Sequence, residues 1–469
     1  MEVPSVDLFD NLSPLDHRYY MSNQELAESL REYLSETAVI KSEALAEAAL
    51  VKALAKSGLC SHEIAKEVLE AAKVITPEEV YAEEEKTKHN IRALVNCLRN
   101  RVSNVAKPWI HFTATSVDIM DSATSYRYKR VTEELVLKVL IELEETLIKL
   151  ARDNAKVLQM GRTHGQHAVP ITFGFSVALY VERLGSRILF IKEASQKLTA
   201  KLAGAVGAYN ASSVVVTDPL QLEADYATEL GLKPADIATQ IVPPEPLLDL
   251  IHGYISAFGV LANIADDMRH LQRSEIGEVF EFFASTQVGS STMPHKRNPW
   301  NFEHVKSLWK SFMPRMMTIY MDQISEHQRD LSNSASARFT GEIIAGLCLA
   351  TDRLNRVLAR IRVDEEAMLR NFNQSAQMVI AEPLYILLAD AGHPDAHECV
   401  RKLTLESGQT GKTLWQLIEE DEELVNLLAS LPEKQLQVIK DPTKYTGLAA
   451  AKAELICDKW EGLIKEVKR

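Results

Sequence analysis

Long stretches of helical apolar spacing constrain the fold of this chain more than any other feature of its sequence. Within residues 131–155, Leu135, Val139, Leu143 and Leu147 recur at the spacing of one helical face, while Glu and Lys occupy the opposite face. Similar stretches cover residues 173–200, 245–285, 303–322 and 338–362. Candidate strands are short and show no regular βαβ alternation. The sequence therefore predicts an all-α protein.

The predicted helices are long and their apolar stripes are wide. Periodic segments of about 25 residues are typical of bundles and coiled coils rather than of small globular cores. A wide stripe needs several neighbours to bury it, so we expect a central long-helix bundle that also mediates oligomerisation. We divide the chain into three helical domains: an N-terminal domain at residues 1–110, a central bundle domain at 111–363 and a C-terminal domain at 364–469.

Composition narrows the classes of function. The 469 residues carry a net charge of −13, which argues against non-specific binding to nucleic acid or to an anionic membrane. A local cluster of cations could still bind an anionic small molecule. The five cysteines are scattered without a CxxC motif, as is typical of reduced thiols in the cytoplasm. We find no signal peptide and no bilayer-spanning apolar stretch, so we expect a cytoplasmic protein.

Polar interruptions between the helices are the places where function is expected. Four stand out: HFTATSVDIMDSA at 111–123, MGRTHGQHAVPITFG at 160–174, GSSTMPHKRNPWNFE at 289–303 and EHQRDLSNSASAR at 326–338. In the second, His164 and His167 allow three interpretations. They are solvated residues of a polar interhelix loop, ligands of a two-histidine metal site for which no third ligand lies nearby, or a general acid or base.

The third interruption is the hardest to explain as a plain connection. Gly289 and the two serines disfavour a helix, and Pro294 and Pro299 prevent one from continuing. The stretch is either a surface linker or a flexible loop, at residues 286–300, that closes over a substrate. Two other motifs are set aside, because TGKT lacks the first glycine of a P-loop and GAVGAY lacks the full dinucleotide fingerprint.

Nine segments in order carry a resemblance to a known family. They are SPLDHRYY, TKHNIRALV, HFTATSVDIMDSA, GRTHGQHAVPITFG, GAVGAYNA, TQIVPPEP, GSSTMPHKRNPWNFE, QRDLSNSASAR and AEPLYILLADAG. Together they resemble the fumarase/aspartase superfamily, and most closely its adenylosuccinate lyases, over essentially the whole chain. GSSxMPxKxNP marks the superfamily, whereas SPLDHRYY, RTHGQHAVP and QRDLSNSASAR indicate the purine branch.

The resemblance implies a mostly α-helical fold in which the central helices of four subunits form one tetrameric helical bundle. Active sites would lie where loops of three subunits meet. The implied partners are small succinylamino purine nucleotides and further copies of this chain in a homotetramer, with no nucleic acid and no membrane. The implied chemistry requires no metal and no organic cofactor.

The implied reaction is β-elimination of fumarate from a succinylamino nucleotide, in which a proton leaves the carbon beside a carboxylate and the C–N bond breaks. By the motif match, Ser290 would be the base, activated by loop closure that brings a cation and backbone N–H groups beside it. Lys296 and Asn298 would hold the carboxylate whose charge grows. His164 would protonate the leaving nitrogen, and Glu303 would orient His164 through a carboxylate–imidazole hydrogen bond.

The remaining residues carried over by the resemblance bind the substrate. Donors to the succinyl carboxylates would be Thr115, Ser116, Thr163 and Gln240. Contacts to phosphate and ribose would be Arg18, Tyr19, Arg329, Ser334 and Arg338, since the arginine fork suits a dianionic phosphate. His89 matches the family's second active-site histidine. The family usually has Asp directly after it, and Asn90 removes that carboxylate, which leaves the exact amino-nucleotide open.

Three classes of function stay open at this stage. One is release of fumarate from adenylosuccinate to give AMP, and from SAICAR to give AICAR. A second is another superfamily activity, either argininosuccinate lyase, against which the phosphate-type arginines argue, or carboxymuconate cycloisomerase. The third is a helical scaffold without catalysis, against which the presence of Ser290, His164, Lys296 and Glu303 argues.

Overall fold

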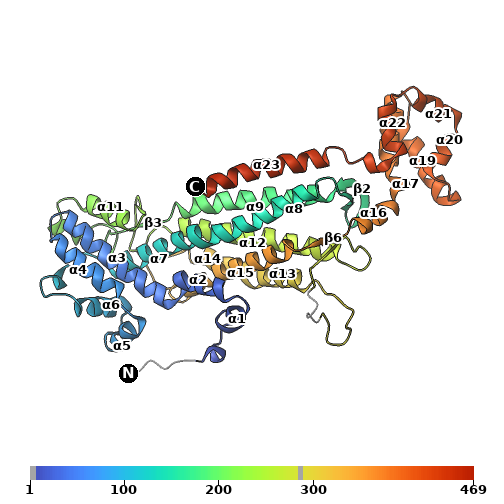
Figure 1. Cartoon of the computed structure of the whole chain (residues 1–469). Coiled ribbons are helices and arrows are strands. Elements are labelled where there is room, and N and C mark those ends of the chain that lie inside the picture. The colour runs from blue at the N-terminus through green and yellow to red at the C-terminus, as the bar shows by residue number, and fades with distance from the viewer. Residues whose placement is uncertain (1–6, 284–288, 469) are drawn as a thin grey trace. The chain divides into compact units, whose positions relative to one another are not determined.

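The structure is a computed structural model that describes residues 7–283 and 289–468, and it is mostly helical (Figure 1). The α-helices are α1 (Tyr20–Ser22), α2 (Gln24–Leu34), α3 (Glu36–Lys56), α4 (His62–Lys73), α5 (Pro77–Thr87), α6 (Asn90–Arg99), α7 (Ser116–Val131), α8 (Leu137–Asp153), α9 (Phe173–Ser195), α10 (Ser212–Val215), α11 (Pro219–Glu229), α12 (Glu245–Leu271), α13 (Trp300–Phe312), α14 (Met316–Met321), α15 (Thr340–Leu358), α16 (Glu365–Asn373), α17 (Ala376–Val379), α18 (Ala381–Asp390), α19 (Ala396–Thr410), α20 (Leu414–Glu419), α21 (Glu422–Ala429), α22 (Glu433–Lys440) and α23 (Ala449–Val467).

Short helical turns and strands complete the described elements. The 3₁₀ turns are η1 (Leu8–Asp10), η3 (Lys107–Trp109), η5 (Met313–Arg315), η6 (Ser336–Phe339) and η7 (Pro442–Lys444), and the π-helical turns are η2 (Leu15–Tyr19) and η4 (Thr132–Val136). The strands are β1 (Leu158–Thr163), β2 (Gln166–Thr172), β3 (Thr199–Ala200), β4 (Lys233–Pro234), β5 (Val279–Phe280) and β6 (Arg362–Val363). They form three two-stranded sheets: β1–β2 and β5–β6 are antiparallel, and β3–β4 is parallel.

The chain divides into two compact units. Unit 1 comprises residues 1–141, 186–259 and 307–352, and unit 2 comprises residues 142–185, 260–306 and 353–469. The three domains drawn from the sequence stay a prediction.

Unit 1 is built around α3, which packs against α4, α7 and α11 (Figure 1). Ala44 and Ala46 on α3 are fully buried, and such small side chains let neighbouring helices approach closely. The helix begins at a defined residue, because the Ser35 side chain accepts a hydrogen bond from the Ala38 N–H at 3.2 Å. Helix α5 begins in the same way with a capping box between Thr76 and Glu79.

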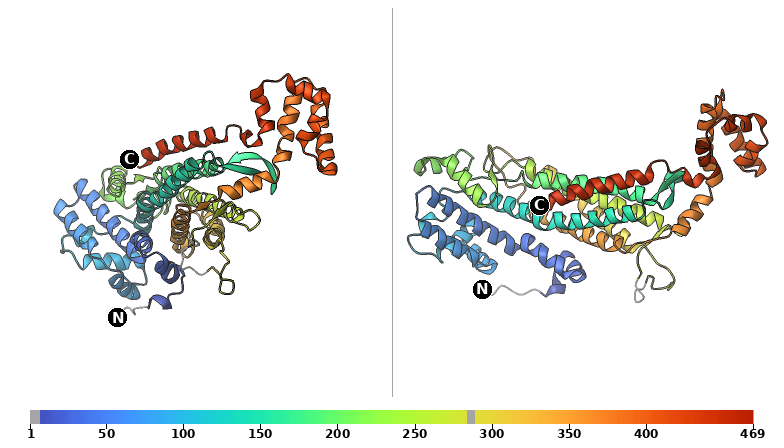
Figure 2. Two further views of the ribbon diagram at one scale, coloured as in Figure 1. Left: turned by 45° about the vertical axis from the view of Figure 1, so that its right-hand side comes forward. Right: turned by 45° about the horizontal axis from the view of Figure 1, so that its top comes forward.

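In unit 2, helix α23 runs beside α8 and α9 (Figures 1 and 2). Trp460 lies against Gly185, where an added Cβ would be 2.4 Å from the indole ring, and its Nε1 donates to Glu182 at 2.7 Å. On the α8 side, Cys457 Sγ lies 3.6 Å from the Ile148 carbonyl oxygen. Helix α23 therefore completes the packing of two helices formed much earlier in the chain.

A second apolar cluster of unit 2 belongs to helices α18 to α22. Leu384 and Leu388 of α18 and Leu414 of α20 are fully buried in it, with Leu424 of α21 and Ile439 of α22 beside them. These short helices thus share a core of their own.

The all-α prediction is confirmed, and a helix lies within each of the five predicted stretches. Two stretches were drawn too long. Helix α12 ends at Leu271, and the following segment turns at Gly277, which has φ 64°. The stretch 303–322 is interrupted at Pro314 in η5, because proline has no N–H to continue the helical hydrogen bonds.

Among the described helices, α12 alone has the length and hydropathy that crossing a membrane would require. Of its most apolar window, 61% is buried within the protein. That degree of burial is typical of the core helix of a soluble protein.

Candidate active site

The residues expected to act on a substrate are divided between the two units. Unit 1 contains Arg18, Tyr19, His89, Asn90, Thr115, Ser116, Gln240, Arg329, Ser334 and Arg338. Unit 2 contains Thr163, His164, Ser290, Lys296, Asn298 and Glu303.

Thr115 and Ser116 lie at the N-terminus of α7, where backbone N–H groups and the helix dipole favour an anion. Thr115 is the N-cap residue and Ser116 the first helical residue. The Thr115 N–H donates to Asp118 Oδ2 at 2.8 Å, which fixes the start of the helix. Both hydroxyl residues are half-buried, so the helix end combines donors with partial shielding from water.

His89 and Asn90 occupy the corresponding place on α6. His89 is the N-cap residue, and its Nδ1 accepts a hydrogen bond from the Arg92 N–H at 3.3 Å. Asn90 Nδ2 lies 3.9 Å from the sulfur of Met120 on α7. The structure thus brings His89 and Asn90 beside the helix whose first turn holds Thr115 and Ser116.

The segment that carries Gln240 is hydrogen-bonded to the residue before Arg329 and to a side chain of α7. The Gln240 N–H donates to the Gln328 carbonyl at 3.1 Å, and the Val242 N–H donates to Asp121 Oδ2 at 2.9 Å. Burial raises the pKa of Asp121 to about 6, although the Val242 hydrogen bond and the charges of Lys201 and Arg329 oppose the shift. Asp121 therefore ties the Gln240 segment to α7 in the neighbourhood of Arg329.

Tyr19 and Arg338 line one cavity of about 400 Å³ in unit 1. Its wall also includes Arg31, Glu36 and Glu342. The cavity combines two tyrosine rings and two guanidinium groups with the carboxylates of Asp16, Glu36 and Glu342, so its lining carries charges of both signs. Arg18 and Ser334 are exposed residues of the same unit.

His164 lies at the tip of the β1–β2 hairpin, where a polar interhelix loop was one of our expectations. His164 and Gly165 have φ values of 53° and 74°, as the two central residues of a type I′ hairpin turn require. Gly161 lies at the bulge opposite Val169, where a Cβ would be 2.5 Å from the Val169 carbonyl oxygen. Thr163 and His164 are both exposed, so the turn presents them outward.

The base of this hairpin is anchored by a buried carboxylate. Glu278 is fully buried and accepts from Arg162 Nη2 at 2.5 Å, from Gln159 at 2.9 Å and from Asn371 at 2.9 Å. His167 points to a different partner, Ser375 Oγ at 2.7 Å. Burial, followed by the positive charge of Arg162, lowers the pKa of His167. The two histidines therefore have separate surroundings, one exposed and one packed.

The loop that carries Ser290, Lys296 and Asn298 is closed at its base. Asn298 Nδ2 donates to the Gly289 carbonyl at 3.0 Å, and a Cβ on Gly289 would lie 2.1 Å from the Lys296 carbonyl oxygen. Ser290 Oγ accepts from the backbone N–H groups of Thr292 and Met293 at 3.3 and 3.0 Å. Lys296 is exposed. Residues 286–288 of the expected loop 286–300 lie outside the described residues.

Glu303 is exposed on the first turn of α13. No hydrogen bond joins Glu303 to His164 among the residues that the structure describes. The helix itself begins on a different carboxylate, because buried Glu281 accepts from the Phe302 N–H at 2.9 Å and from Asn301 at 2.7 Å. Burial raises the pKa of Glu281.

Sequence reasoning missed the buried charges that support these segments, namely Glu47, Asp118, Lys201 and Glu278. The signal was weak: each is a single charged residue in a helical or apolar context. The GAVGAY motif was also left without a role in the predictions from sequence. Gly207 has φ 79° and its Cβ would lie 2.0 Å from the Ala238 carbonyl oxygen, so a glycine is required for the close approach to the Gln240 segment.

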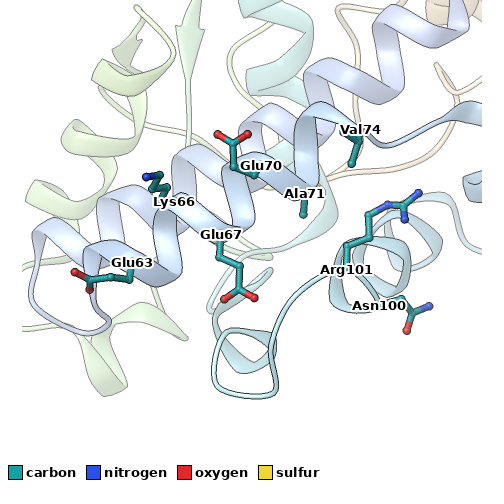
Figure 3. Close-up of a pocket in the computed structure, with 8 residues that line it drawn as sticks. All are labelled: Glu63, Lys66, Glu67, Glu70, Ala71, Val74, Asn100 and Arg101. Atoms are coloured by element: carbon teal, nitrogen blue, oxygen red, sulfur yellow. The ribbon is translucent and has the colours of Figure 1, made fainter.

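A larger hollow of about 710 Å³ lies elsewhere on unit 1, along α4 (Figure 3). Its lining includes Glu63, Glu67, Glu70 and Arg101, and none of the expected site residues. Glu67 already accepts from the Ser103 N–H at 2.5 Å and from the Ser103 hydroxyl at 2.8 Å.

Solved structures of two other proteins share this fold. A fumarate lyase from Mesorhizobium sp. BNC1 superposes with a TM-score of 0.80 at 23% identity, covering 92% of this chain and 97% of that one. The 3-carboxy-cis,cis-muconate lactonizing enzyme from Pseudomonas putida superposes with a TM-score of 0.79 at 24% identity, covering 94% and 100%. At these identities the superpositions define the class of scaffold.

Sequence similarity narrows the class of protein further. Residues 17–311 match the family described as Lyase, and residues 325–445 match the one described as Adenylosuccinate lyase C-terminal. The adenylosuccinate lyase of Archaeoglobus fulgidus is 31% identical over 94% of this chain and 97% of its own length. That of Pyrococcus abyssi is 32% identical over 97% and 98%. The chain belongs to the adenylosuccinate lyase family of carbon–nitrogen lyases.

Proposed function

We propose that this chain releases fumarate from adenylosuccinate, giving AMP, and from SAICAR, giving AICAR, in purine nucleotide biosynthesis. The observation that carries the proposal is the intact set of Ser290, His164, Lys296 and Glu303 in a chain of this family. The family membership places the reaction among C–N bond cleavages, and these four residues supply the groups that such a cleavage needs.

In the proposed reaction, Ser290 Oγ takes the proton from the carbon beside the substrate carboxylate. The electron pair of that C–H bond forms the double bond of fumarate, and the C–N bond breaks with its electrons going to nitrogen. His164 protonates that nitrogen. The two backbone N–H groups that donate to Ser290 Oγ support this role, because they would stabilise an ionised hydroxyl.

Lys296 and Asn298 would hold the carboxylate on which negative charge grows, and Glu303 would orient His164. The exposure of His164 on its turn and of Glu303 on α13 supports their access to a substrate. Thr163 on the same turn would donate to a succinyl carboxylate.

Substrate binding would use the residues of unit 1. The helix end at Thr115 and Ser116, with Gln240 nearby, favours a dicarboxylate. Tyr19 and Arg338, which line one cavity, would contact the phosphate and ribose together with Arg18, Arg329 and Ser334. His89 and Asn90 would contact the substrate close to α7.

We further propose that the protein is a cytoplasmic homotetramer whose active sites combine residues of different subunits, with three helical domains in each chain. Exposed apolar side chains on and after α14, namely Met317, Met321 and Ile324, support burial by another copy. Five free thiols support a reducing compartment.

The decisive experiment adds adenylosuccinate to the purified protein and follows AMP, fumarate and the ultraviolet absorbance of the substrate. Formation of equal amounts of AMP and fumarate is expected. Fumarate released only from argininosuccinate would move the protein to a sister activity, and no turnover of any succinyl compound would favour a scaffold. Sedimentation of the same sample tests the tetramer.

A further inference from the structure

The segment His111–Ser116, which leads into α7, holds an unfavourable backbone conformation. His111 and Thr113 have φ values of 63° and 64°, in the left-handed region that β-branched residues such as threonine rarely enter. The Oγ1 of Thr113 is also buried with no hydrogen-bond partner among the described residues. Such a conformation costs roughly 1–3 kcal/mol per residue and persists only when the surroundings impose it.

Two buried carboxylates impose this conformation, one at each end of the segment. Glu47 on α3 accepts from the His111 N–H at 3.0 Å and lies 2.7 Å from His111 Nδ1. Asp118 accepts from the Thr115 N–H at 2.8 Å. Glu47 and Asp118 are both fully buried, so neither contact competes with water.

Asp118 is in turn paired with Lys201, and both side chains are fully buried. The carboxylate also accepts from the N–H groups of Ala203 at 3.2 Å and of Gly204 at 3.2 Å. Ser122, one turn further along α7, accepts from the Lys201 N–H at 3.1 Å. Asp118 therefore joins the segment 111–116 to the segment 201–204.

A buried ion pair adds little to stability, because the loss of hydration offsets most of the attraction. What this pair does supply is a fixed geometry without a net charge. An unpaired carboxylate at Asp118, one turn below Thr115 and Ser116, would repel a carboxylate bound there, and Lys201 cancels that repulsion.

We propose that Asp118, neutralised by Lys201, is a positioning residue that holds Thr115 and Ser116 in the geometry that binds a substrate carboxylate. The inference rests on the proposed function, since it takes the succinyl group as the ligand of this helix end. Asp118 itself does not touch the substrate.

The test compares two double variants, D118L/K201M and D118N/K201M. D118N/K201M removes the two buried charges together, so its melting temperature should exceed those of the single variants D118N and K201M, each of which leaves one buried charge unpaired. D118L/K201M should melt lower than D118N/K201M, because leucine leaves the N–H groups of Thr115, Ala203 and Gly204 without their acceptor. Only D118N/K201M keeps an oxygen that accepts from the Thr115 N–H.

Product inhibition separates position from stability. For D118L/K201M, the inhibition constant of fumarate should rise about tenfold, the loss of roughly 1.4 kcal/mol. The inhibition constant of AMP, whose expected contacts include Tyr19 and Arg338, should stay unchanged within about twofold. For D118N/K201M, fumarate inhibition should stay closer to the wild type. Unchanged fumarate inhibition in D118L/K201M, or a parallel weakening of both ligands, overturns the positioning role.

The milder variant S122A covers the case in which the double variants do not fold. It removes only the hydroxyl that holds the Lys201 backbone, and it should weaken fumarate more than AMP. Equal effects on both ligands contradict the proposal. Absence of turnover in the wild type would instead refute the proposed function, so the two failures are distinct.

Discussion

The segment His111–Ser116 of unit 1 and the loop Gly289–Asn298 of unit 2 both carry residues proposed to contact the same substrate, yet they are held differently. The first is fixed by the buried carboxylates of Glu47 and Asp118. The second is largely exposed and is held mostly by bonds among its own residues, such as that of Asn298 to Gly289, with one bond from Gln272 to the Arg297 carbonyl at 3.4 Å. The binding groups of unit 1 are therefore fixed before a substrate arrives, whereas the proposed base and the carboxylate-binding residues Lys296 and Asn298 lie where backbone movement costs little.

The largest expected effect is that of S290A on turnover. Removing the proposed base should lower kcat about 10³-fold, because a positioned acid or base contributes on the order of 10²–10⁴. The melting temperature should stay unchanged, because Ser290 Oγ accepts only local hydrogen bonds. Adenylosuccinate turnover and thermal unfolding measure the two quantities. S291A, at an exposed position of the same loop, is the control, and equal losses in both variants would show that the loop and not the Ser290 hydroxyl matters.

Replacing Glu47 tests whether the segment His111–Ser116 depends on a buried carboxylate. E47A leaves the His111 N–H without its acceptor and opens a cavity beneath a strained segment, so the free energy of unfolding should fall by about 2–4 kcal/mol. E47Q keeps the size and an acceptor and should lose much less. Urea denaturation measures both variants. A stability of E47A equal to that of the wild type would mean that Glu47 does not hold the segment.

G289A tests whether the base of the exposed loop must be close. The new Cβ would meet the Lys296 carbonyl oxygen at 2.1 Å and force the ends of the loop apart. Activity should fall about tenfold, while stability changes by less than about 1 kcal/mol, because half-buried Gly289 belongs to a loop that is otherwise largely exposed. H295A, at an exposed position of the same loop, should retain activity. A large fall in melting temperature for G289A would show that this loop, too, is part of the rigid framework.

The smallest expected effect is the pH dependence of stability caused by Glu43, which lies on α3 with Glu47. Burial, and then the charge of Glu36, raises the pKa of Glu43 on α3 from 4.5 to about 8. A raised carboxyl pKa adds stability that is present at low pH and is lost as pH rises from 4.5 through 8. E43Q should therefore gain stability over the wild type at pH 8.5 and little at pH 5, as denaturation at both pH values will show. E32Q at an exposed position should show no such trend, and a pH-independent gain for E43Q would contradict the assignment.

The local sequence pattern was sufficient to predict the helices, but it did not predict the buried residues that hold the site segments in place. Leu135 to Leu147 predicted their helix because periodicity records which face is buried. The apolar residues Ile276, Val279 and Phe280 extended the predicted helix past Leu271, although Gly277 turns the chain there. The turn of His164 was not recognised as a hairpin, because the pairing of β1 with β2 and the contacts of Glu278 that anchor β1 exist only in the folded chain.

The pairing of Asp118 with Lys201 shows why the buried part of the site could not be predicted. The two residues are 83 positions apart, and nothing in either local sequence selects the other. Motif resemblance identified the side chains expected to contact a substrate, since these belong to sequence motifs such as GSSTMPHKRNP. The residues that hold those motifs in place can be identified only in the folded structure.

The packing of α23 against α8 sets an order of events during synthesis. Ile148 and Cys457 are 309 residues apart, so a ribosome adding about 5–20 residues per second reaches the second roughly 15–60 s after the first. During that interval the surface around Gly185 lacks the indole that will cover it. Helices α8 and α9 are therefore expected to reach their final packing only after α23 has left the ribosome.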